Sequence, residues 1–218
     1  MMTKKVMILA ANGQIAQIVE HRILTEDQFA DVDLTLFLRN TSRLANLQDN
    51  PRVTLVEGDI TDPTAVSAAM AGQDLVFVAV VDHDQQNRLT NSVIAGMKAN
   101  NVSRVLFANV LGLYNEVGGE FGRWNSEMIG AGMAPARQSD KLLADSGLDY
   151  TTLRLPWLND RGIKYVVTTK EQAYKGVSGS RQSVADVVLH IVADPSKYSR
   201  DSIGMADPDT EGRDRPVY

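Results

Sequence analysis

The chain has 218 residues, a formal net charge of −5, and hydrophobic and charged fractions of 44% and 22%. This length suits one large folded domain, and the fractions are those of ordinary globular proteins. The excess of acid argues against a broad nucleic-acid surface, which needs clustered basic side chains. Because the sequence contains no cysteine, disulfides, thiolate metal ligands and cysteine nucleophiles are excluded.

An apolar run near the amino terminus ends at Asn12 and Gly13. It is too short for a secretory leader and far below the ~18 residues of a membrane span, so we interpret it as a strand. We therefore expect a cytoplasmic protein with neither a membrane nor a nucleic acid as partner. An oligomer is compatible with the sequence.

Short apolar runs alternate with longer segments of helical spacing. The runs predicted as strands are 6–9, 34–38, 53–56, 75–81, 105–108 and 150–155. The segments predicted as helices are 15–24, 63–70, 85–100, 136–146 and 184–193. Continuous apolar runs are typical of strands buried on both faces, and strand–helix repetition implies right-handed crossovers. These patterns predict an α/β protein, one domain over 1–218, with a parallel sheet and helices on both of its faces.

The last third of the chain interrupts this rhythm with polar and turn residues. We expect 110–134, 156–183 and 195–218 to form a small C-terminal cap over the carboxyl edge of the sheet, on the substrate side. Glycines alternate with large apolar side chains in 118–134, which favours a mobile loop against a flat apolar ligand. The alternative is a loop folded onto a small core of its own.

A strand, a tight turn and a helix start follow one another in 6–16. This is the context of a dinucleotide fingerprint, whose glycines serve the turn, the approach of the pyrophosphate and helix packing. Only Gly13 is kept here, with Ala10 and Ala16 at the other two places. The methyl group of Ala10 avoids strain only if the backbone keeps a negative φ. The alternative is an ordinary strand-to-helix turn in a protein with another ligand.

The second predicted strand runs into Arg39, where NAD-binding proteins carry an acid for the ribose. Arg43 follows one helical turn later, and two guanidinium groups can clamp a 2′-phosphate. This pattern predicts NADP(H), against the alternative of two solvated arginines. After the third strand, Asp59 is predicted to accept from the adenine amino group and Ile60 to pack on the ring, while Asp62 caps the next helix.

In their order and spacing these segments resemble the atypical short-chain dehydrogenases/reductases, in particular the NmrA-like and flavin reductase or biliverdin reductase B-like group. The matching segments are 9–16, 38–44, 58–59, 71–74, 97–99, 141–143, 146–150 and 183–186. The resemblance implies a Rossmann-type NAD(P)-binding fold with NADP(H) as cofactor. It also sets Val81 where the family has a glycine, which narrows the cofactor groove. The predicted cofactor-binding residues are Ala10, Asn12, Gly13, Gln14, Ile15, Arg39, Arg43, Asp59, Ile60, Val80, Val81 and Pro156.

Typical short-chain dehydrogenases use Tyr-x-x-x-Lys, in which the lysine lowers the pKa of the tyrosine. This chain has Lys141, but Arg137 stands four residues before it. After the fifth strand, where those enzymes place a serine, only Asn109 offers a polar side chain. Tyr114 lies just beyond, although an aromatic in such a loop more often packs. We predict Asn109, Tyr114 and Lys141 as catalytic residues, and the resemblance implies that Lys141 holds the nicotinamide ribose.

His83 lies between two aspartates, yet alternate side chains point in opposite directions and no other histidine is placed to help. We therefore expect no metal site. His83 is an alternative proton donor near the nicotinamide, against the more common solvated loop histidine. Trp157 is expected to form the wall opposite the 118–134 loop.

The missing acid does not preclude hydride transfer, because a conjugated acceptor can collect its proton from water. The sequence thus favours an NADP(H)-dependent oxidoreductase that acts on a small flavin-, quinone- or other aromatic-like acceptor. The alternative, suggested by the NmrA-like resemblance, is a non-catalytic NADP(H)-binding redox sensor or regulatory protein. An enzyme like the sugar-nucleotide epimerases is disfavoured, because that chemistry needs the absent tyrosine.

Overall fold

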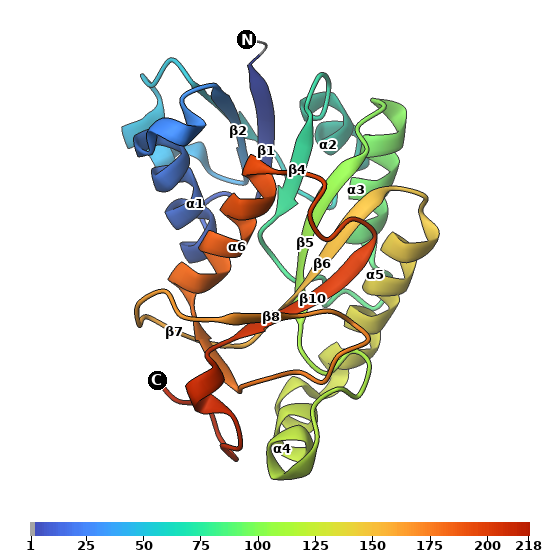
Figure 1. Ribbon diagram of the computed structural model, residues 1–218. Coiled ribbons are helices and arrows are strands. Elements are labelled where there is room, and N and C mark those ends of the chain that lie inside the picture. The colour runs from blue at the N-terminus through green and yellow to red at the C-terminus, as the bar shows by residue number, and fades with distance from the viewer. Residues whose placement is uncertain (1–2) are drawn as a thin grey trace.

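The computed structural model describes residues 3–218, which form a sheet of eight strands between two layers of helices (Figure 1). The strand order is β3-β2-β1-β4-β5-β6-β10-β8. The strands are β1 (Lys4–Leu9), β2 (Val32–Leu38), β3 (Val53–Glu57), β4 (Leu75–Val78), β5 (Arg104–Val110), β6 (Asp149–Leu155), β8 (Val166–Thr168) and β10 (Asp201–Ala206). All neighbours are parallel except β8, which pairs antiparallel with β10. The predicted parallel α/β fold is confirmed.

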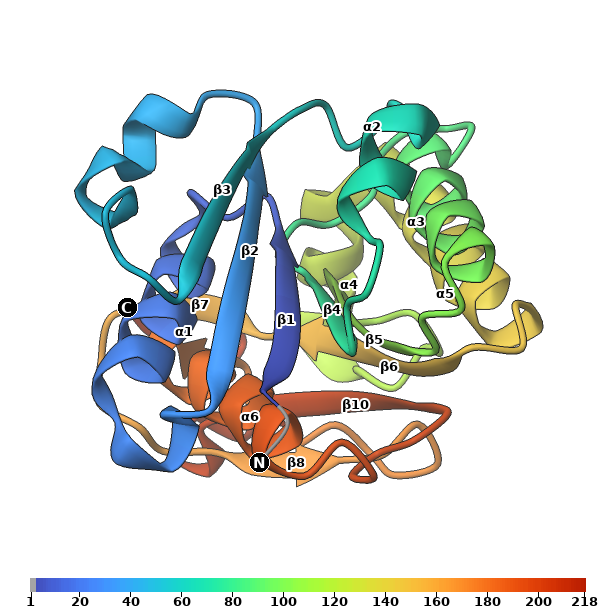
Figure 2. The ribbon, with the colours of Figure 1, turned by 90° about the horizontal axis from the view of Figure 1, so that it is seen from above.

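Helices cover both faces of the sheet, as Figure 2 shows from above. They are α1 (Gln14–Thr25), α2 (Pro63–Ala69), α3 (Arg88–Ala99), α4 (Gly119–Ile129), α5 (Met133–Asp145) and α6 (Arg181–Ala193). The α1 and α6 helices pack together on one face, and α2, α3 and α5 lie on the other. This double cover explains the continuous apolar runs: all four residues of β4 are at most 1% exposed.

Two helix starts show how local chemistry sets the boundaries. The Asp62 carboxylate accepts from the backbone of Thr64 and Ala65, so it caps α2 as predicted. The Ser180 hydroxyl caps α6, which therefore begins three residues before the predicted start at 184. The fourth strand ends at Val78, earlier than the predicted 81, because the chain leaves the sheet toward Asp82. That buried carboxylate accepts from the backbone and hydroxyl of Thr90.

The segment 118–134 differs from the expected loop, since most of it is the helix α4. Phe121 and Trp124 are one helical turn apart, and both pack into a satellite core with Leu111 and Tyr174. Burial of these aromatic rings outweighs the low helix propensity of the glycines. In Figure 1, α4 lies at the same end of the molecule as the carboxyl terminus and β7 (Trp157–Asn159). β7 pairs with β9 (Ser178–Ser180) in a separate two-stranded sheet.

Residues 195–218 also depart from the expected cap, because 201–206 form β10 inside the main sheet. The strand reads Asp-Ser-Ile-Gly-Met-Ala, whose polar and small residues hide the apolar pattern of a buried strand. Gly204 is required there, because a Cβ would collide with the ring of Tyr174. β8, which falls within the expected cap segment 156–183, also joins the edge of the main sheet, whereas β7 and β9 lie outside it.

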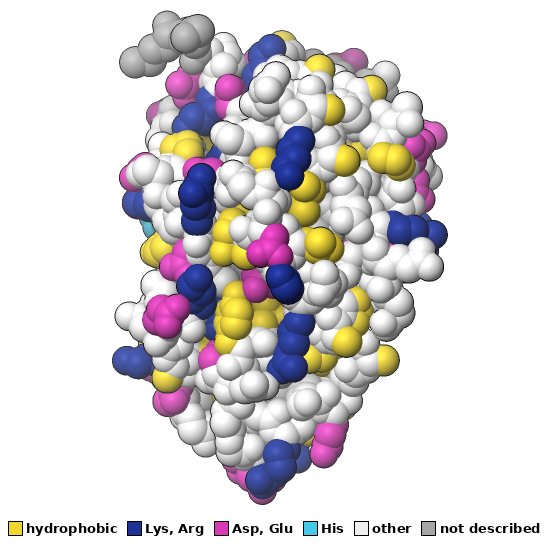
Figure 3. Space-filling view, turned by 90° about the vertical axis from the view of Figure 1, so that its right-hand side faces the viewer, with side chains coloured by type: hydrophobic (Ala, Val, Ile, Leu, Met, Phe, Trp, Pro, Cys, Tyr) yellow, Lys and Arg dark blue, Asp and Glu magenta, His cyan; other side chains and the backbone are white. Residues whose placement is uncertain are grey.

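On the face turned toward the viewer in Figure 3, lysine and arginine side chains are interspersed with acidic and apolar ones. This face therefore carries no large area of a single sign. Within residues 3–218, no helix is long and apolar enough to cross a membrane.

Candidate functional site

The turn after β1 opens the amino-terminal end of α1. Gly13 is the N-cap of α1, and its N–H donates to the Ala10 carbonyl over 3.0 Å. No side chain within residues 3–218 caps this helix. The first-turn amides therefore face outward with the positive end of the helix dipole, a site suited to a phosphate. Ala10 has φ 60°, so it takes the left-handed conformation that its methyl group disfavours by about 1–2 kcal/mol. Such strain persists mainly at functional sites.

A cleft of about 280 Å³ lies across the ends of β1, β2, β3 and β4. Its lining residues are Ala10, Asn12, Phe37, Leu38, Arg39, Gly58, Asp59, Ile60, Thr61, Val80 and Leu89. Asp59 accepts from the Thr61 amide at 2.8 Å and from its hydroxyl at 2.7 Å, and these hydrogen bonds lower the pKa of Asp59. The carboxylate is thus ionised at neutral pH. Gly58 leaves space for the Phe37 ring, which a Cβ would strike.

The neighbouring cleft, of about 310 Å³, is lined by Asn12, Arg39, Asn40 and Arg43. Asn40 accepts from the Ser42 amide and hydroxyl, which shapes the turn that carries Arg43. Both arginines are exposed, and within residues 3–218 neither guanidinium group makes a hydrogen bond or ion pair. Since no acid lines the cleft, its electrostatic character is that of an anion site.

A cavity of about 800 Å³ continues along the same edge of the sheet. It is lined by Val81, His83, Gln85, Asn109, Val110, Leu111, Asn125, Met128, Ile129, Ala131, Gly132, Leu155, Pro156, Trp157, Leu158, Arg181 and Tyr218. The wall thus combines the ends of β5 and β6 with α4 and the start of α6. Its volume and apolar lining are typical of a small-molecule site.

Hydrogen bonds inside the protein already use the amide groups in this cavity. Asn109 donates to the Ala136 carbonyl over 3.0 Å and accepts from the Val110 amide over 2.8 Å. The Trp157 indole N–H donates to the side-chain oxygen Oδ1 of Asn125 over 2.9 Å, which fixes the plane of the indole. Asn109 is therefore locked in place, with the polar ends of its side chain turned toward the protein.

The other two predicted catalytic residues lie away from the cavity wall. The Tyr114 hydroxyl donates to the Asp140 carboxylate, and the guanidinium of Arg154 lies 5.4 Å from the centre of its ring. Burial and the Asp140 contact both raise the pKa of Tyr114. Lys141 is 66% exposed and pairs with Asp145 on the solvent side of α5. The structure thus brings only Asn109 of the three to the cavity.

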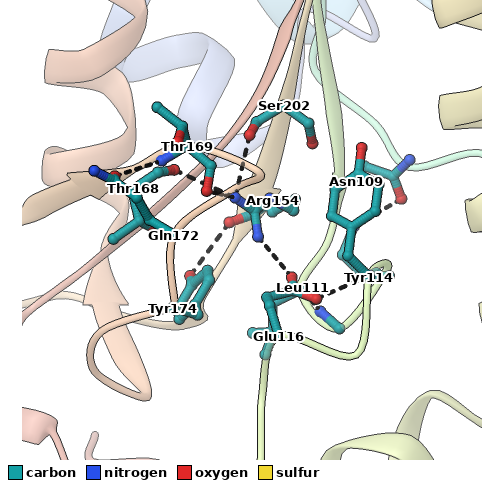
Figure 4. Close-up of polar contacts among 12 residues, drawn as sticks. Asn109, Leu111, Tyr114, Glu116, Arg154, Thr168, Thr169, Gln172, Tyr174 and Ser202 are labelled. Carbon is teal, nitrogen blue, oxygen red and sulfur yellow. Dashed lines mark hydrogen bonds and ion pairs between the residues drawn. The ribbon is translucent and has the colours of Figure 1, made fainter.

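The sequence interpretation missed a buried ion pair behind the cavity, between Arg154 of β6 and Glu116 (Figure 4). Arg154 is 0% and Glu116 5% exposed, and their N–O distance is 2.8 Å. Arg154 also donates to the backbone carbonyls of Thr168, Thr169 and Ser202. A signal was available, since an arginine inside the apolar run 150–155 needs a buried partner.

Glu116 uses its remaining capacity to hold the loop after β5. Its carboxylate accepts from the backbone N–H groups of Gly112 and Tyr114, each over 2.9 Å. Gly112 has φ 93°, a conformation that favours glycine. Because Leu111 precedes this turn and lines the cavity, the ion pair positions part of the cavity wall.

His83 is exposed and lines the cavity beside Gly132, where a Cβ would come within 2.9 Å of the imidazole Nδ1. Gly132 therefore leaves room for the imidazole. In the described part of the chain, no group of three or more His, Cys, Asp or Glu side chains is arranged to hold a metal ion.

The three spaces described above open along one edge of a doubly wound sheet, where the strand order reverses between β1 and β4. This placement defines a dinucleotide-binding protein of Rossmann type. The chain matches the family model described as NAD(P)H-binding over residues 10–195, and it belongs to that family. The predicted dinucleotide cofactor and Rossmann fold are thereby confirmed.

Solved structures of similar proteins agree with this assignment. A Rossmann-fold NAD(P)-binding family protein from Shigella flexneri is 32% identical, with a TM-score of 0.79 and 99% of each chain covered. A short-chain dehydrogenase/reductase from Veillonella parvula, solved in complex with NADP, is 28% identical, with a TM-score of 0.90 and full coverage of both chains. An anaerobillin reductase from Escherichia coli, 18% identical, shares the fold with a TM-score of 0.80 over 98% of this chain and 100% of its own.

Proposed function

We propose that the protein is an NADP(H)-dependent oxidoreductase that passes a hydride to a flat, conjugated small molecule held in the 800 Å³ cavity. The observation that carries the proposal is the row of clefts along one sheet edge. It begins at the guanidinium groups of Arg39 and Arg43, which have no partner among the described residues, and ends in the apolar cavity.

The residues present fit a dinucleotide with a 2′-phosphate. Gly13 and the open first turn of α1 can receive the pyrophosphate, as in related folds. Arg39 and Arg43 supply two planar donor groups for the 2′-phosphate. Asp59 keeps one carboxylate oxygen outside its turn and can accept from the adenine amino group. The NADP complex of the Veillonella parvula protein supports the same choice of cofactor.

Residues at the cavity end of the groove are proposed to position the reactants. Val81 and Pro156 line the cavity wall, and Asn109 is immobilised by its two internal hydrogen bonds. When bound there, NADPH supplies a hydride, which with one proton reduces the acceptor by two electrons. Tyr114 and Lys141 lie outside the cavity, so we assign the proton to water and the catalytic effect to proximity and orientation.

The decisive experiment follows NADPH absorbance with a panel of flavins and quinones. Sustained turnover with at least one acceptor is expected. Tight NADPH binding without turnover across the whole panel would favour the alternative, a non-catalytic redox sensor, and would contradict the proposal. That alternative draws its support from the absence of the Tyr-x-x-x-Lys acid among the described residues of the cavity wall.

A further inference from the structure

The wall of the 800 Å³ cavity is nearly uncharged. Among the described residues that line it, Arg181 is the one whose side chain has a permanent charge, and none has an acidic side chain. Most of the others are aliphatic or aromatic, and the Asn109 and Asn125 amides are used internally. A single cation in an apolar cavity selects a ligand with one anionic group on an otherwise apolar body. The anionic group then pairs with the cation, and the apolar body contacts the apolar wall.

The Arg181 guanidinium group has hydrogen-bond donors that the described residues leave unused. It is the first residue of α6, and its Nη1 donates to the Asp160 carboxylate over 2.8 Å. The Asp160 side chain is 82% exposed, so this ion pair is solvent-screened and readily rearranged. The Nε and Nη2 groups make no hydrogen bond within residues 3–218. Half of the guanidinium fork is thus available to a second anion.

Two unusually exposed apolar side chains stand at the same cavity. Met128 of α4 is 57% exposed and Tyr218 is 74% exposed, and both contribute to the cavity wall with Trp157. Large apolar side chains gathered at one site commonly mark a binding surface. A planar ring between them would be covered by thioether, phenol and indole groups, which suit flat conjugated ligands.

We propose that Arg181 is a specificity-determining residue that binds an acidic substituent, such as a carboxylate or sulfonate, on the ring of the acceptor. The ring itself lies against Trp157, Met128 and Tyr218. This inference rests on the proposed function, because it names the class of acceptor that the same cavity takes. Arginine suits the role, because its fork matches the paired oxygens of such groups.

The test compares two acceptors that share a ring, 1,4-naphthoquinone and 1,4-naphthoquinone-2-sulfonate, with NADPH as donor. Arg181→Gln should lower kcat/KM for the sulfonate by about 10- to 100-fold, the scale of a lost hydrogen bond to a charged group. The value for 1,4-naphthoquinone should change less than about twofold on the same reasoning. Arg123→Gln on α4 is the matched control, since Arg123 is 68% exposed and pairs with Glu120 away from the cavity wall. It should leave both values unchanged, and unchanged NADPH affinity in each variant verifies folding.

Equal losses for the two quinones, or no loss for either, would overturn the role of Arg181 while leaving the proposed oxidoreductase intact. If the wild-type protein reduces neither quinone nor any acceptor of the panel, the proposed function fails instead. Quenching of indole fluorescence by 1,4-naphthoquinone-2-sulfonate then decides the inference on binding alone. Weaker quenching in Arg181→Gln than in Arg123→Gln supports it, and equal or absent quenching refutes it.

Discussion

Removal of one partner from the Arg154–Glu116 pair should destabilise the protein strongly. Both side chains are almost completely buried, so loss of either carboxylate or guanidinium leaves an uncompensated charge, at a cost of about 3–5 kcal/mol. The Glu116 carboxylate accepts hydrogen bonds from three N–H groups. In Glu116→Gln the NH₂ group of the new amide would face one of these donors and could not accept its hydrogen bond. For a domain of this size, such a loss corresponds to a fall in Tm on the order of 6–20 °C.

Urea unfolding monitored by indole fluorescence measures the effect, with Glu116→Gln, Arg154→Met and the double variant forming a cycle. The double variant should be less destabilised than the sum of the single variants by about 1–3 kcal/mol, because it removes both charges together. Glu120→Gln is the matched control, since its Arg123–Glu120 pair is exposed, and we expect a change within about 0.5 kcal/mol. Additive single effects, or a loss below about 1 kcal/mol for Glu116→Gln, would refute the reasoning.

The same ion pair predicts how the free energy of unfolding changes at acidic pH. Burial raises the pKa of Glu116, but hydrogen bonds from Arg154 and Gly112 and the Arg154 charge outweigh it, so the net pKa lies below the usual value. A carboxylate with a depressed folded pKa contributes stability above its unfolded pKa, about 4.3, and loses it as pH falls through the folded pKa. Unfolding free energies measured from pH 7 downward should therefore fall less steeply below about pH 4.3 in Glu116→Gln than in the wild type. Identical slopes would contradict the assignment.

Three further predictions concern the cofactor-binding residues and the candidate proton donors. Arg39→Ala should weaken NADPH binding in calorimetric titration by about 1.5–3 kcal/mol and leave NADH nearly unchanged; equal wild-type affinities for the two cofactors would refute the arginine clamp. Tyr114→Phe, His83→Ala and Lys141→Ala should each slow turnover by much less than the ~10²–10⁴-fold typical of a lost acid, and a thousandfold loss for Tyr114→Phe with NADPH affinity intact would make Tyr114 the acid. Ala10→Gly should raise the urea-unfolding free energy, by up to about 1 kcal/mol, by relieving the left-handed strain at φ 60°; a destabilised variant would show that the strain is absent.

The sequence by itself determined the order of strands up to β6, the helices between them except α4, and the family of the fold. Those signals are local: continuous apolar runs arise wherever both faces of a strand are covered, and turn residues occur where the chain must reverse. The same kind of local signal predicts the nucleotide end of the groove, because Gly13, Arg39 and Arg43 come after strands whose ends share one edge, and the role of these residues in cofactor binding stays a prediction. The structure places Arg39 and Arg43 together in one cleft.

Only the tertiary structure determined which residues line the cavity at the other end of the groove. Lys141 follows Asp140 by one residue on α5, yet about 100° of helix rotation turns Lys141 to solvent and Asp140 to the core. The spacing of residues in the sequence does not show which side of α5 is buried, because the buried face mixes alanine, serine and aspartate with apolar residues. Likewise α4 exists because its aromatic rings pack with Trp157 and Tyr174 from later segments of the chain, and the Arg154–Glu116 pair joins positions 38 residues apart. Such contacts are made between elements, and their energy appears only when the elements pack.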